Sequence, residues 1–338
     1  MMTLPNPLRA VVIDQELRTT KQNKLYWQVM LRTKVGVVKS FMWGVPNDVQ
    51  TNPNYPHVGD IIQLDTFKDQ MAEYQNIVID AWHNITKESV PKEDSAIFKV
   101  YKASDDEMRE AFALLKDSSF WENSEHHRFV MACLGKLDLE KLKMSPAAVL
   151  IHHAYNGGLL VHSAEVLALC RAYVDVSFSR YGFINKDVLY AAAILHDIGK
   201  IKTYSFNAIG TTHQLITEKI IGHIPYGMFL VQTIAEEGKI QVEPEFVIEL
   251  MHCIAAHHGT VAWGSIKEPQ SLEAGIISRL DYISSRNGMM EKVLQENVQS
   301  GQPLQADFKI YGDQYFASSG IKRYVEEKGI DAAVNFKD

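Results

Sequence analysis

The sequence has few cysteines, and the three it has cannot build a disulfide framework. Cys133, Cys170 and Cys253 are an odd number of widely separated residues, and none belongs to the Cys-x-x-Cys spacing that is typical of zinc sites. We therefore expect all three to be small buried residues of a protein that works in a reducing compartment.

The sequence also lacks a long apolar run. The longest uninterrupted one, Val188–Leu195, has eight residues, whereas a transmembrane helix needs roughly 18. Residues 1–10 show no basic start leading into an apolar stretch and a cleavage site, so no secretory signal is visible. These absences exclude a membrane span and favour a cytoplasmic protein.

An excess of positive charge is missing as well. The chain has 34 Lys and Arg against 41 Asp and Glu, a net charge of -7, so it lacks the global basic field of a tight duplex binder. Any contact with nucleic acid must be local. The 338 residues, 46% hydrophobic and 22% charged, have a globular composition and a length that suggests about two domains.

The first part of the chain predicts a small β-barrel. Apolar and β-branched residues alternate in short runs that are separated by turn formers. Five strands in about 80 residues favour an OB-type barrel. The predicted strands are Leu8–Ile13, Leu25–Arg32, Val35–Trp43, Ile61–Leu64 and Asn76–Ala81.

The rest of the chain predicts helices. Ser104 and Glu107 form a capping-box pattern in front of apolar residues at helical spacing. We predict helices over about 104–117, 124–136, 159–181, 186–197, 217–236, 244–256 and 270–286. Lys, Glu, Pro and Asp cluster in Thr86–Ser95, the predicted linker. The expected organisation is α+β and multidomain: a barrel over 1–90, an all-α helical bundle over 91–300, and a tail over 301–338 without an assigned role.

Histidine is unusually concentrated, with nine of the 13 between His152 and His258. His196-Asp197 ends an apolar helical run. A neutral imidazole beside a carboxylate can bind one divalent metal, or the carboxylate can bridge two, if neighbouring helices supply further ligands. An isolated His-Asp pair is usually chance, but further candidate ligands lie along the chain: His162, His223, His257, His258 and Asp281.

In this order, the residues resemble the signature of the HD-domain metal-dependent phosphohydrolases. The sequence further resembles the YhaM-type 3'-to-5' exoribonucleases, which also carry an N-terminal OB-type domain, over about residues 7–290. The segments that carry this resemblance are Pro146-Ala147-Ala148, His152-His153-Ala154-Tyr155, Gly157 to Ser163, Leu195 to Ile201, Gly222-His223-Ile224, His257-His258-Gly259 and Glu273-Ala274.

The resemblance implies two metal ions that share Asp197 as a bridging ligand. One would also take His162, His196 and Asp281, and the other His223, His257 and His258. Two such ions activate water and neutralise phosphate charge during in-line attack. Lys200, one helical turn from His196, would direct its ammonium toward the phosphate. Ligation by several imidazoles suits Mn, the first choice, or Co, Fe or Ni better than Mg.

Several residues allow more than one interpretation. Some HD enzymes use a single metal, in which case His223, His257 and His258 become substrate contacts. His152 and His153 either contact the substrate phosphate or pack under the glycine turn that follows them. Gly264-Ser265 resembles a family loop near the site, so Ser265 is a candidate substrate contact.

Barrel aromatics beside basic residues are candidates for stacking on unpaired bases. Tyr26, Lys39 and Trp43 are the predicted contacts, and Trp27, Phe41 and Tyr74 are further aromatic candidates. The alternative for each is the barrel core, because a small barrel is filled by large inward side chains.

The function that the resemblance implies is a metal-dependent 3'-to-5' exonuclease that acts on single-stranded RNA, or also single-stranded DNA, and releases nucleoside 5'-monophosphates. Two alternatives remain: an HD phosphohydrolase of free or cyclic nucleotides, and a non-catalytic single-strand binding protein. A homo-oligomer is compatible with the sequence, which predicts no membrane partner.

Overall fold

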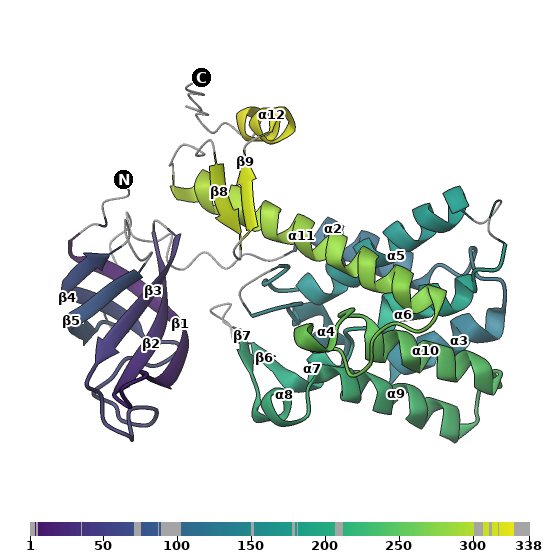
Figure 1. Ribbon diagram of the computed structural model, residues 1–338, viewed down its shortest axis with the longest axis horizontal. Coiled ribbons are helices and arrows are strands. Elements are labelled where there is room, and N and C mark those ends of the chain that lie inside the picture. Colours follow the sequence, from purple (N-terminus) through teal and green to yellow (C-terminus); the bar gives the residue numbers. More distant parts are fainter. Residues whose placement is uncertain are drawn as a thin grey trace. The chain divides into compact units, whose positions relative to one another are not determined.

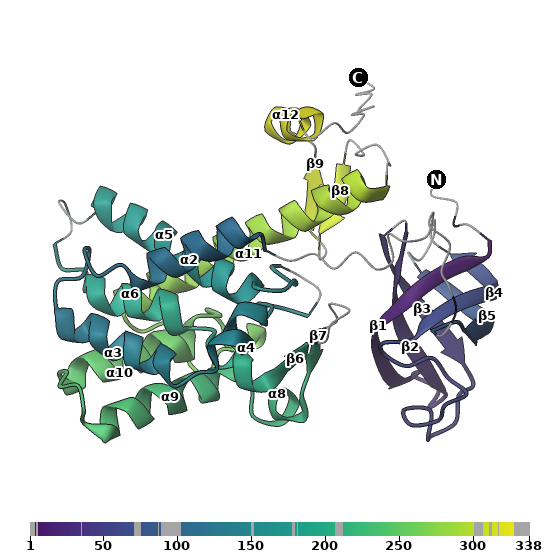
Figure 2. The ribbon, with the colours of Figure 1, turned by 180° about the vertical axis from the view of Figure 1, so that it is seen from behind.

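The computed structural model describes residues 4, 6–34, 36–70, 76–86, 88, 103–149, 152–177, 180, 182–206, 212–300, 307–310, 313–316 and 318–327. The chain divides into two compact units. One comprises residues 1–100, 208–211 and 290–338, and the other residues 101–207 and 212–289. Figures 1 and 2 show the N-terminal strands and the helical region from two sides.

Five strands close into a barrel in the order β1-β2-β3-β5-β4. The pair β3 and β5 is parallel and the other pairs are antiparallel. This five-stranded closed arrangement confirms the predicted OB-type barrel. The strands are β1 (Leu8–Thr19), β2 (Leu25–Thr33), β3 (Gly36–Trp43), β4 (Ile61–Gln70) and β5 (Asn76–Asn84).

Strands β1 and β4 run further than their apolar residues predict. The second half of β1, from Gln15 to Thr19, is largely polar, yet it pairs with β2 residue by residue. The end of β4, from Thr66 to Gln70, pairs with β5 in the same way. Backbone hydrogen bonding therefore extends both strands beyond the residues that fill the barrel.

Alternation along β2 separates the barrel core from its outer face. Trp27, Val29 and Leu31 are buried in the core. The indole Nε1 of Trp27 donates to the carbonyl oxygen of Pro56 at 3.0 Å, so this aromatic is a core residue and not a stacking platform. Its neighbour Tyr26 takes the opposite face, because successive strand residues point to opposite sides.

The helical region packs around one buried helix. Helix α6 (Lys186–Leu195) contacts α3, α5 and α10, and every residue from Val188 to Leu195 is buried. The capping box of Ser104 and Glu107 opens α2 as predicted. The surrounding helices are α2 (Asp105–Lys116), α3 (Ser124–Gly135), α4 (Leu139–Met144), α5 (Gly158–Ser177), α9 (His223–Glu237), α10 (Pro244–Ala256) and α11 (Leu272–Ser300).

The predicted helix over 217–236 is wrong as a single element. It consists of α8 (Ile216–Ile220) and α9, and Gly222 between them has a φ of 86°. This left-handed backbone ends one helix and starts the next, and it suits glycine, which lacks a Cβ. His223 therefore stands at the first position of α9.

Short elements that the sequence analysis did not predict connect and follow the helices. They are α4, α7 (Lys200–Thr203), the hairpin of β6 (Tyr204–Phe206) and β7 (Thr212–Gln214), the 3-10 helix η2 (Val261–Trp263), and, in the tail, β8 (Asp307–Ile310), β9 (Asp313–Phe316) and α12 (Ser319–Glu327). Helix α11 also runs to Ser300, beyond its predicted end near residue 286.

Some predictions fall on parts of the chain that the structure does not describe. Of the predicted linker Thr86–Ser95, only Thr86 and Glu88 are described, and Tyr74 and Val35 lie outside the described residues. Among the helices of the described residues, none has the length and apolar character needed to cross a membrane.

Candidate metal centre

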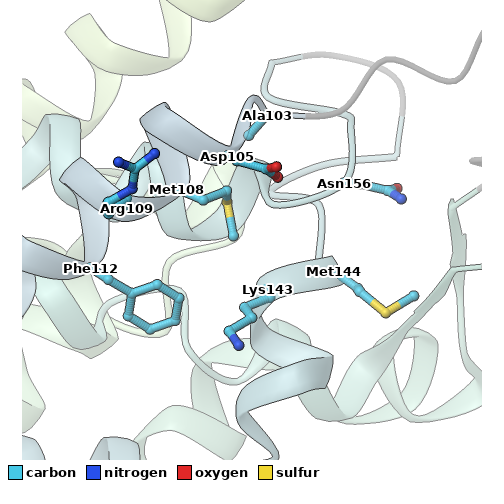
Figure 3. Close-up of a pocket in the computed structure, with 8 residues that line it drawn as sticks. All are labelled: Ala103, Asp105, Met108, Arg109, Phe112, Lys143, Met144 and Asn156. Carbon is cyan, nitrogen blue, oxygen red and sulfur yellow. The ribbon is translucent and has the colours of Figure 1, made fainter.

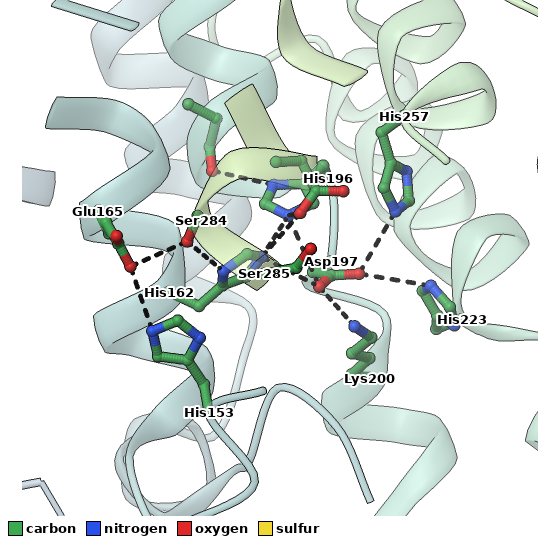
Figure 4. Close-up of polar contacts among 12 residues, drawn as sticks. His153, His162, Glu165, His196, Asp197, Lys200, His223, His257, Ser284 and Ser285 are labelled. Atoms are coloured by element: carbon green, nitrogen blue, oxygen red, sulfur yellow. Dashed lines mark hydrogen bonds and ion pairs between the residues drawn. The ribbon is translucent and has the colours of Figure 1, made fainter. Parts of the chain in front are cut away.

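The ends and inner faces of five helices bring the predicted ligands together (Figure 4). His196 and His257 are the C-terminal caps of α6 and α10, and His223 begins α9. His162 lies in α5 and Asp281 in α11. His162, His196, Asp197, His223 and His257 are all buried. The structure thus collects residues that are up to about a third of the chain apart.

The first group of candidate ligands combines the rings of His162 and His196 with the carboxylates of Asp281 and Asp197. The Nε2 atom of His162 lies 3.1 Å from Oδ1 of Asp281 and 3.2 Å from Nε2 of His196. Oδ2 of Asp197 lies 3.5 Å from Nε2 of His196 and 3.7 Å from that of His162. This group offers two imidazoles and two carboxylates to one cation.

A second group faces the other oxygen of the same carboxylate. Oδ1 of Asp197 lies 3.3 Å from Nε2 of His223 and 3.5 Å from Nε2 of His257. His258 completes this group, whose four ligand atoms lie within 4.8 Å of one another. Asp197 therefore stands between the two groups, with one oxygen toward each.

Hydrogen bonds at the outer side of the rings direct nitrogen lone pairs inward. Nδ1 of His196 lies 3.1 Å from the carbonyl oxygen of Ala193, and Nδ1 of His257 lies 2.8 Å from that of Ile254. A carbonyl oxygen only accepts, so each Nδ1 carries the proton and each Nε2 is left as a lone pair. This is the orientation that metal-ligating histidines take.

Side chains hold the rings of His223 and His162. Nδ1 of His223 lies 2.8 Å from Oε1 of Glu218. Nδ1 of His162 lies 2.9 Å from Oγ of Ser284, and Ser284 donates its own proton to Oε2 of Glu165 at 2.9 Å. The sequence alone does not indicate these three partners, because a serine or a glutamate at helical spacing carries no metal-binding signal of its own.

The donor set fits a divalent cation. Four buried atoms of the second group have no hydrogen-bond partner among the described residues: Oδ1 of Asp197, Nε2 of His223, Nε2 of His257 and Nδ1 of His258. Leaving buried polar atoms unsatisfied is costly, and each is an electron-pair donor. A cation between these atoms removes that cost without a rearrangement of the protein.

The electrostatics of the centre keep His196, His258 and Asp197 in their metal-binding forms, whereas at His257 burial is outweighed by the contact with Asp197, which raises the pKa of that ring. Burial lowers the pKa of His196 to about 4 and that of His258 to about 3, so both rings are neutral at pH 7. Burial alone would raise the pKa of Asp197, but the charge of Lys200 and the nearby imidazoles outweigh it and hold that pKa well below the usual range.

Lys200, whose ammonium is predicted to point toward a phosphate, contacts the carboxylate of Asp197. Its Nζ lies 2.5 Å from Oδ2 of Asp197, and its side chain is buried. Burial lowers the pKa of Lys200, and the adjacent carboxylate more than offsets this, so the ammonium stays charged. Lys200 is thus a fixed positive charge against the carboxylate that lies between the two groups.

Two glycines allow the close packing of the centre. A Cβ on Gly199 would lie 1.9 Å from the carbonyl oxygen of His223, which only a shift of the α9 backbone could relieve. A Cβ on Gly288 would lie 2.7 Å from the ring of His153. The contact at position 199 explains why glycine follows Ile198 in the His-Asp segment.

The candidate substrate contacts of the helical region lie next to these groups. The rings of His152 and His153 are each 5.2 Å from that of His162, centre to centre. His153 also pairs with Glu165, with its Nε2 3.2 Å from Oε2. Ser265 is buried, and its Oγ has no hydrogen-bond partner among the described residues.

The barrel candidates share its outer face. Tyr26 of β2 lies opposite Trp43 of β3, with ring centres 4.9 Å apart. Phe41 lies 5.9 Å from Trp43, and Nζ of Lys39 lies 5.4 Å from the ring centre of Phe41. Trp43 is 55% exposed and lines a hollow of about 490 Å³ together with Lys24.

A separate pocket of about 410 Å³ does not involve the candidate ligands (Figure 3). Met108, Phe112 and Met144 give it an apolar lining. Its two basic residues are each engaged with a carboxylate, Arg109 with Asp106 and Lys143 with Glu140. This pocket contains no histidine among its lining residues and is separate from the candidate ligands.

Comparison with known proteins agrees with this geometry. The HD domain family matches residues 159–286, which contain the candidate metal ligands, and an HD domain implies dependence on a divalent metal. The 3'-5' exoribonuclease YhaM of Oceanobacillus iheyensis is 30% identical over 287 residues, which cover 84% of each chain.

Further relatives match over about half of their length. The YhaM exoribonuclease of Listeria welshimeri is 38% identical over 52% of this chain and 53% of its own, and that of Bacillus subtilis is 33% identical over 51% and 52%. No solved structure matches the chain at a significant level. The match to the Oceanobacillus protein includes most of both chains, and the chain therefore belongs to the YhaM family of metal-dependent 3'-5' exoribonucleases.

Proposed function

We propose that this protein shortens single-stranded RNA from its 3' end at a two-metal centre and releases nucleoside 5'-monophosphates. The carboxylate of Asp197 carries the proposal, because its two oxygens face two separate groups of imidazoles. The names of the relatives, 3'-5' exoribonucleases, support the substrate and the polarity. We propose the division of labour as a barrel over 1–90 that holds RNA, a catalytic region over 91–300 and a tail over 301–338.

The proposed ligands divide between the two cations. His162, His196 and Asp281 would hold one, His223, His257 and His258 the other, and Asp197 both. When bound, the two cations supply an activated water and positive charge against the phosphate. Five imidazoles and two carboxylates suit Mn best, with Co, Fe or Ni as the alternatives, because Mg prefers oxygen ligands and water.

The remaining residues act on the substrate. Lys200 supplies a fixed positive charge beside the reacting phosphate, which stabilises negative charge as it develops. His152, His153 and Ser265 are the proposed contacts to the terminal nucleotide. The hydroxyl of Ser265 can donate, and burial lowers the pKa of His152 and His153, so these rings bind as neutral donors or acceptors.

A nuclease assay tests the proposed function. Incubated with a 5'-labelled single-stranded RNA, the protein is expected to give a ladder that shortens from the 3' end, faster with Mn²⁺ than with Mg²⁺. The products should be nucleoside 5'-monophosphates on thin-layer chromatography. A deoxyribonucleotide of the same sequence measures the preference for RNA. Intact RNA, together with hydrolysis of free or cyclic nucleotides, would refute the exonuclease.

We propose that the outer face of β2 and β3 binds the RNA chain upstream of the cut. Tyr26, Phe41 and Trp43 offer ring faces to successive bases, and Lys39 offers charge to the backbone. The acidic net charge of -7 makes this local arrangement necessary.

Replacing Trp43 tests this face. Trp43→Ala is expected to weaken binding of single-stranded RNA about five- to 100-fold, the range for the loss of one base–aromatic stack. Fluorescence anisotropy with labelled RNA in EDTA measures this without cleavage. Phe229→Ala in α9 is the matched control, since Phe229 is 60% exposed and lies outside the barrel. Equal affinity of Trp43→Ala and the unmodified protein would remove the barrel face from RNA binding.

We also propose the cytoplasm as the place of action. Cys133, Cys170 and Cys253 are buried free thiols, and burial raises the pKa of Cys133 and Cys253 to about 12. Such thiols are unreactive and compatible with a reducing compartment. Cell fractionation with an antibody to the protein would decide the point.

A further inference from the structure

Two large aromatic side chains are exposed on the chain segments that carry candidate metal ligands. Trp263, in the 3-10 helix after His257-His258, is 65% exposed, and Tyr282, in α11, is 42% exposed. Their rings are parallel to within 11°, with centres 6.1 Å apart. Two exposed aromatic rings in a parallel arrangement are more typical of a binding surface than of the edge of a hydrophobic core.

Hydrogen bonds fix the segment that carries Trp263. The backbone N–H of Trp263 donates to the carbonyl oxygen of Thr260, and that of Ser265 donates to the same oxygen at 3.2 Å. The N–H of Ile266 donates to the carbonyl oxygen of Ala255 at 3.0 Å, which ties the turn to α10. Trp263 is therefore held in place before any ligand arrives, and binding need not order it.

Each member of the pair is attached to one group of the metal centre. Tyr282 follows Asp281 directly in α11, and Asp281 belongs to the first group. Trp263 precedes Gly264, where a Cβ would lie 3.2 Å from Nδ1 of His258, which belongs to the second group. The aromatic pair thus joins the two chain segments that supply the outermost ligand of each group.

A positive charge accompanies the rings. The guanidinium carbon of Arg286, one helical turn after Tyr282, lies 4.8 Å from the centre of the Tyr282 ring. Aromatic faces beside an arginine are the combination that proteins use for unpaired bases and the phosphates between them. Duplex nucleic acid does not expose its base faces to such a surface.

We propose that Trp263 and Tyr282 form a subsite that stacks on unpaired bases at the 3' end of the RNA, next to the phosphodiester under attack. The inference rests on the proposed function, because it places the reacting phosphate at the metal centre. Tyr282 follows Asp281 directly, and Trp263 precedes Gly264, which packs against His258, so both rings lie on segments that carry the more exposed candidate ligands. The subsite makes the enzyme sensitive to whether the terminal bases are present and unpaired, without recognising which bases they are.

Kinetics with matched substrates test the subsite. The substrates are a single-stranded RNA and the same RNA with abasic residues at its 3' end. For the unmodified protein, the abasic residues are expected to lower kcat/KM about tenfold. Trp263→Ala should raise KM for the normal RNA by about the same factor, leave kcat within about twofold, and show no further loss on the abasic RNA.

Conservative variants separate stacking from other roles. Trp263→Phe and Tyr282→Phe keep a ring and should keep most of the affinity, whereas Phe229→Ala, an exposed aromatic of α9, should change nothing. Bound Mn²⁺ should be equal in Trp263→Ala and the unmodified protein. Anisotropy of labelled RNA in EDTA repeats the comparison without catalysis, so the subsite is tested even if the protein does not cleave RNA.

Three results would overturn the proposal. The first is an unchanged KM and RNA affinity in Trp263→Ala. The second is an equal loss on normal and abasic RNA, which would mean that Trp263 does not contact bases. The third is a change in molecular mass by light scattering in Trp263→Ala, which would mean that the pair covers a second copy of the chain. Failure of the unmodified protein to cleave RNA, with stacking intact in anisotropy, would refute the proposed function alone.

Discussion

Asp197→Asn is expected to abolish binding of both metal ions at once. One oxygen of Asp197 faces the first group of ligands and the other faces the second. An amide keeps one oxygen and presents an N–H₂ group, which repels a cation, on the other side. The loss of charge affects both groups, so Mn²⁺ affinity should fall more than about 100-fold at each and RNA cleavage more than about 1,000-fold. Titration calorimetry and the metal content after dialysis measure the stoichiometry.

The contrast with non-bridging ligands identifies the bridge. Asp281→Asn and His258→Ala each remove a ligand of one group, so one ion should be lost and the other retained. The stoichiometry is therefore expected to fall from two to one in these variants and to zero in Asp197→Asn. A single ion in the unmodified protein, or retention of one ion in Asp197→Asn, contradicts a bridging carboxylate.

The buried charge of Lys200 affects the stability of Asp197→Asn, and its removal provides a control for that variant. With Asp197 neutral, the buried ammonium of Lys200 loses a partner at 2.5 Å, and an uncompensated buried charge destabilises a fold by about 3–5 kcal/mol. Circular dichroism at the assay temperature shows whether Asp197→Asn is folded. In the double variant Asp197→Asn with Lys200→Met, the buried charge is gone, so the fold should recover while the metals remain absent.

Much of the barrel could be predicted from sequence because its residues alternate. The period of two along Tyr26 to Leu31 fixes which side chains fill the core, and the structure buries Trp27, Val29 and Leu31 accordingly. Which aromatic side chains lie next to each other on the outer face depends on the register of the strands. Tyr26 lies beside Trp43 because these two residues are paired between β2 and β3. A sequence read strand by strand does not contain that pairing.

The candidate ligands could be found because their order and spacing are specific, whereas their surroundings could not. A His-Asp pair followed by Ile-Gly-Lys is rare, but Ser284 and Glu165 are ordinary residues of two different helices. Their role exists only because α5 and α11 lie side by side, which brings residues 119 positions apart into hydrogen bonding. The break at Gly222 was missed for a related reason, since apolar periodicity continues across it.

Glu165→Gln is expected to weaken metal binding at the first group alone. As a carboxylate, Glu165 only accepts, so Ser284 must donate to it at 2.9 Å and use its lone pair for the Nδ1–H of His162. These two hydrogen bonds leave Nε2 of His162 unprotonated, with its lone pair toward Asp281. Glutamine can donate to Ser284 in place of accepting, which reverses both hydrogen bonds and moves the proton of His162 to Nε2, where it blocks a cation.

Mutation of a residue that orients a metal-ligating histidine through hydrogen bonds typically lowers metal affinity about 10- to 100-fold. One of the two Mn²⁺ affinities of Glu165→Gln should fall by that factor while the other stays, and kcat should recover at saturating Mn²⁺. Glu249→Gln is the matched control. Glu249 accepts a hydrogen bond from Asn185 and does not belong to the series of hydrogen bonds that ends at His162. The ¹⁵N shifts of His162 report the tautomer directly.

The loss of Mn²⁺ affinity in related variants shows whether Glu165 orients the ring of His162 or only stabilises the packing of the helices. Ser284→Ala breaks the same series of hydrogen bonds without changing any charge, so it should weaken the same Mn²⁺ site as Glu165→Gln. The double variant should be no worse than Ser284→Ala, because Glu165 acts on His162 through that hydroxyl. If the two losses add, or if both Mn²⁺ sites weaken equally, Glu165 stabilises the helices around the centre and does not orient His162.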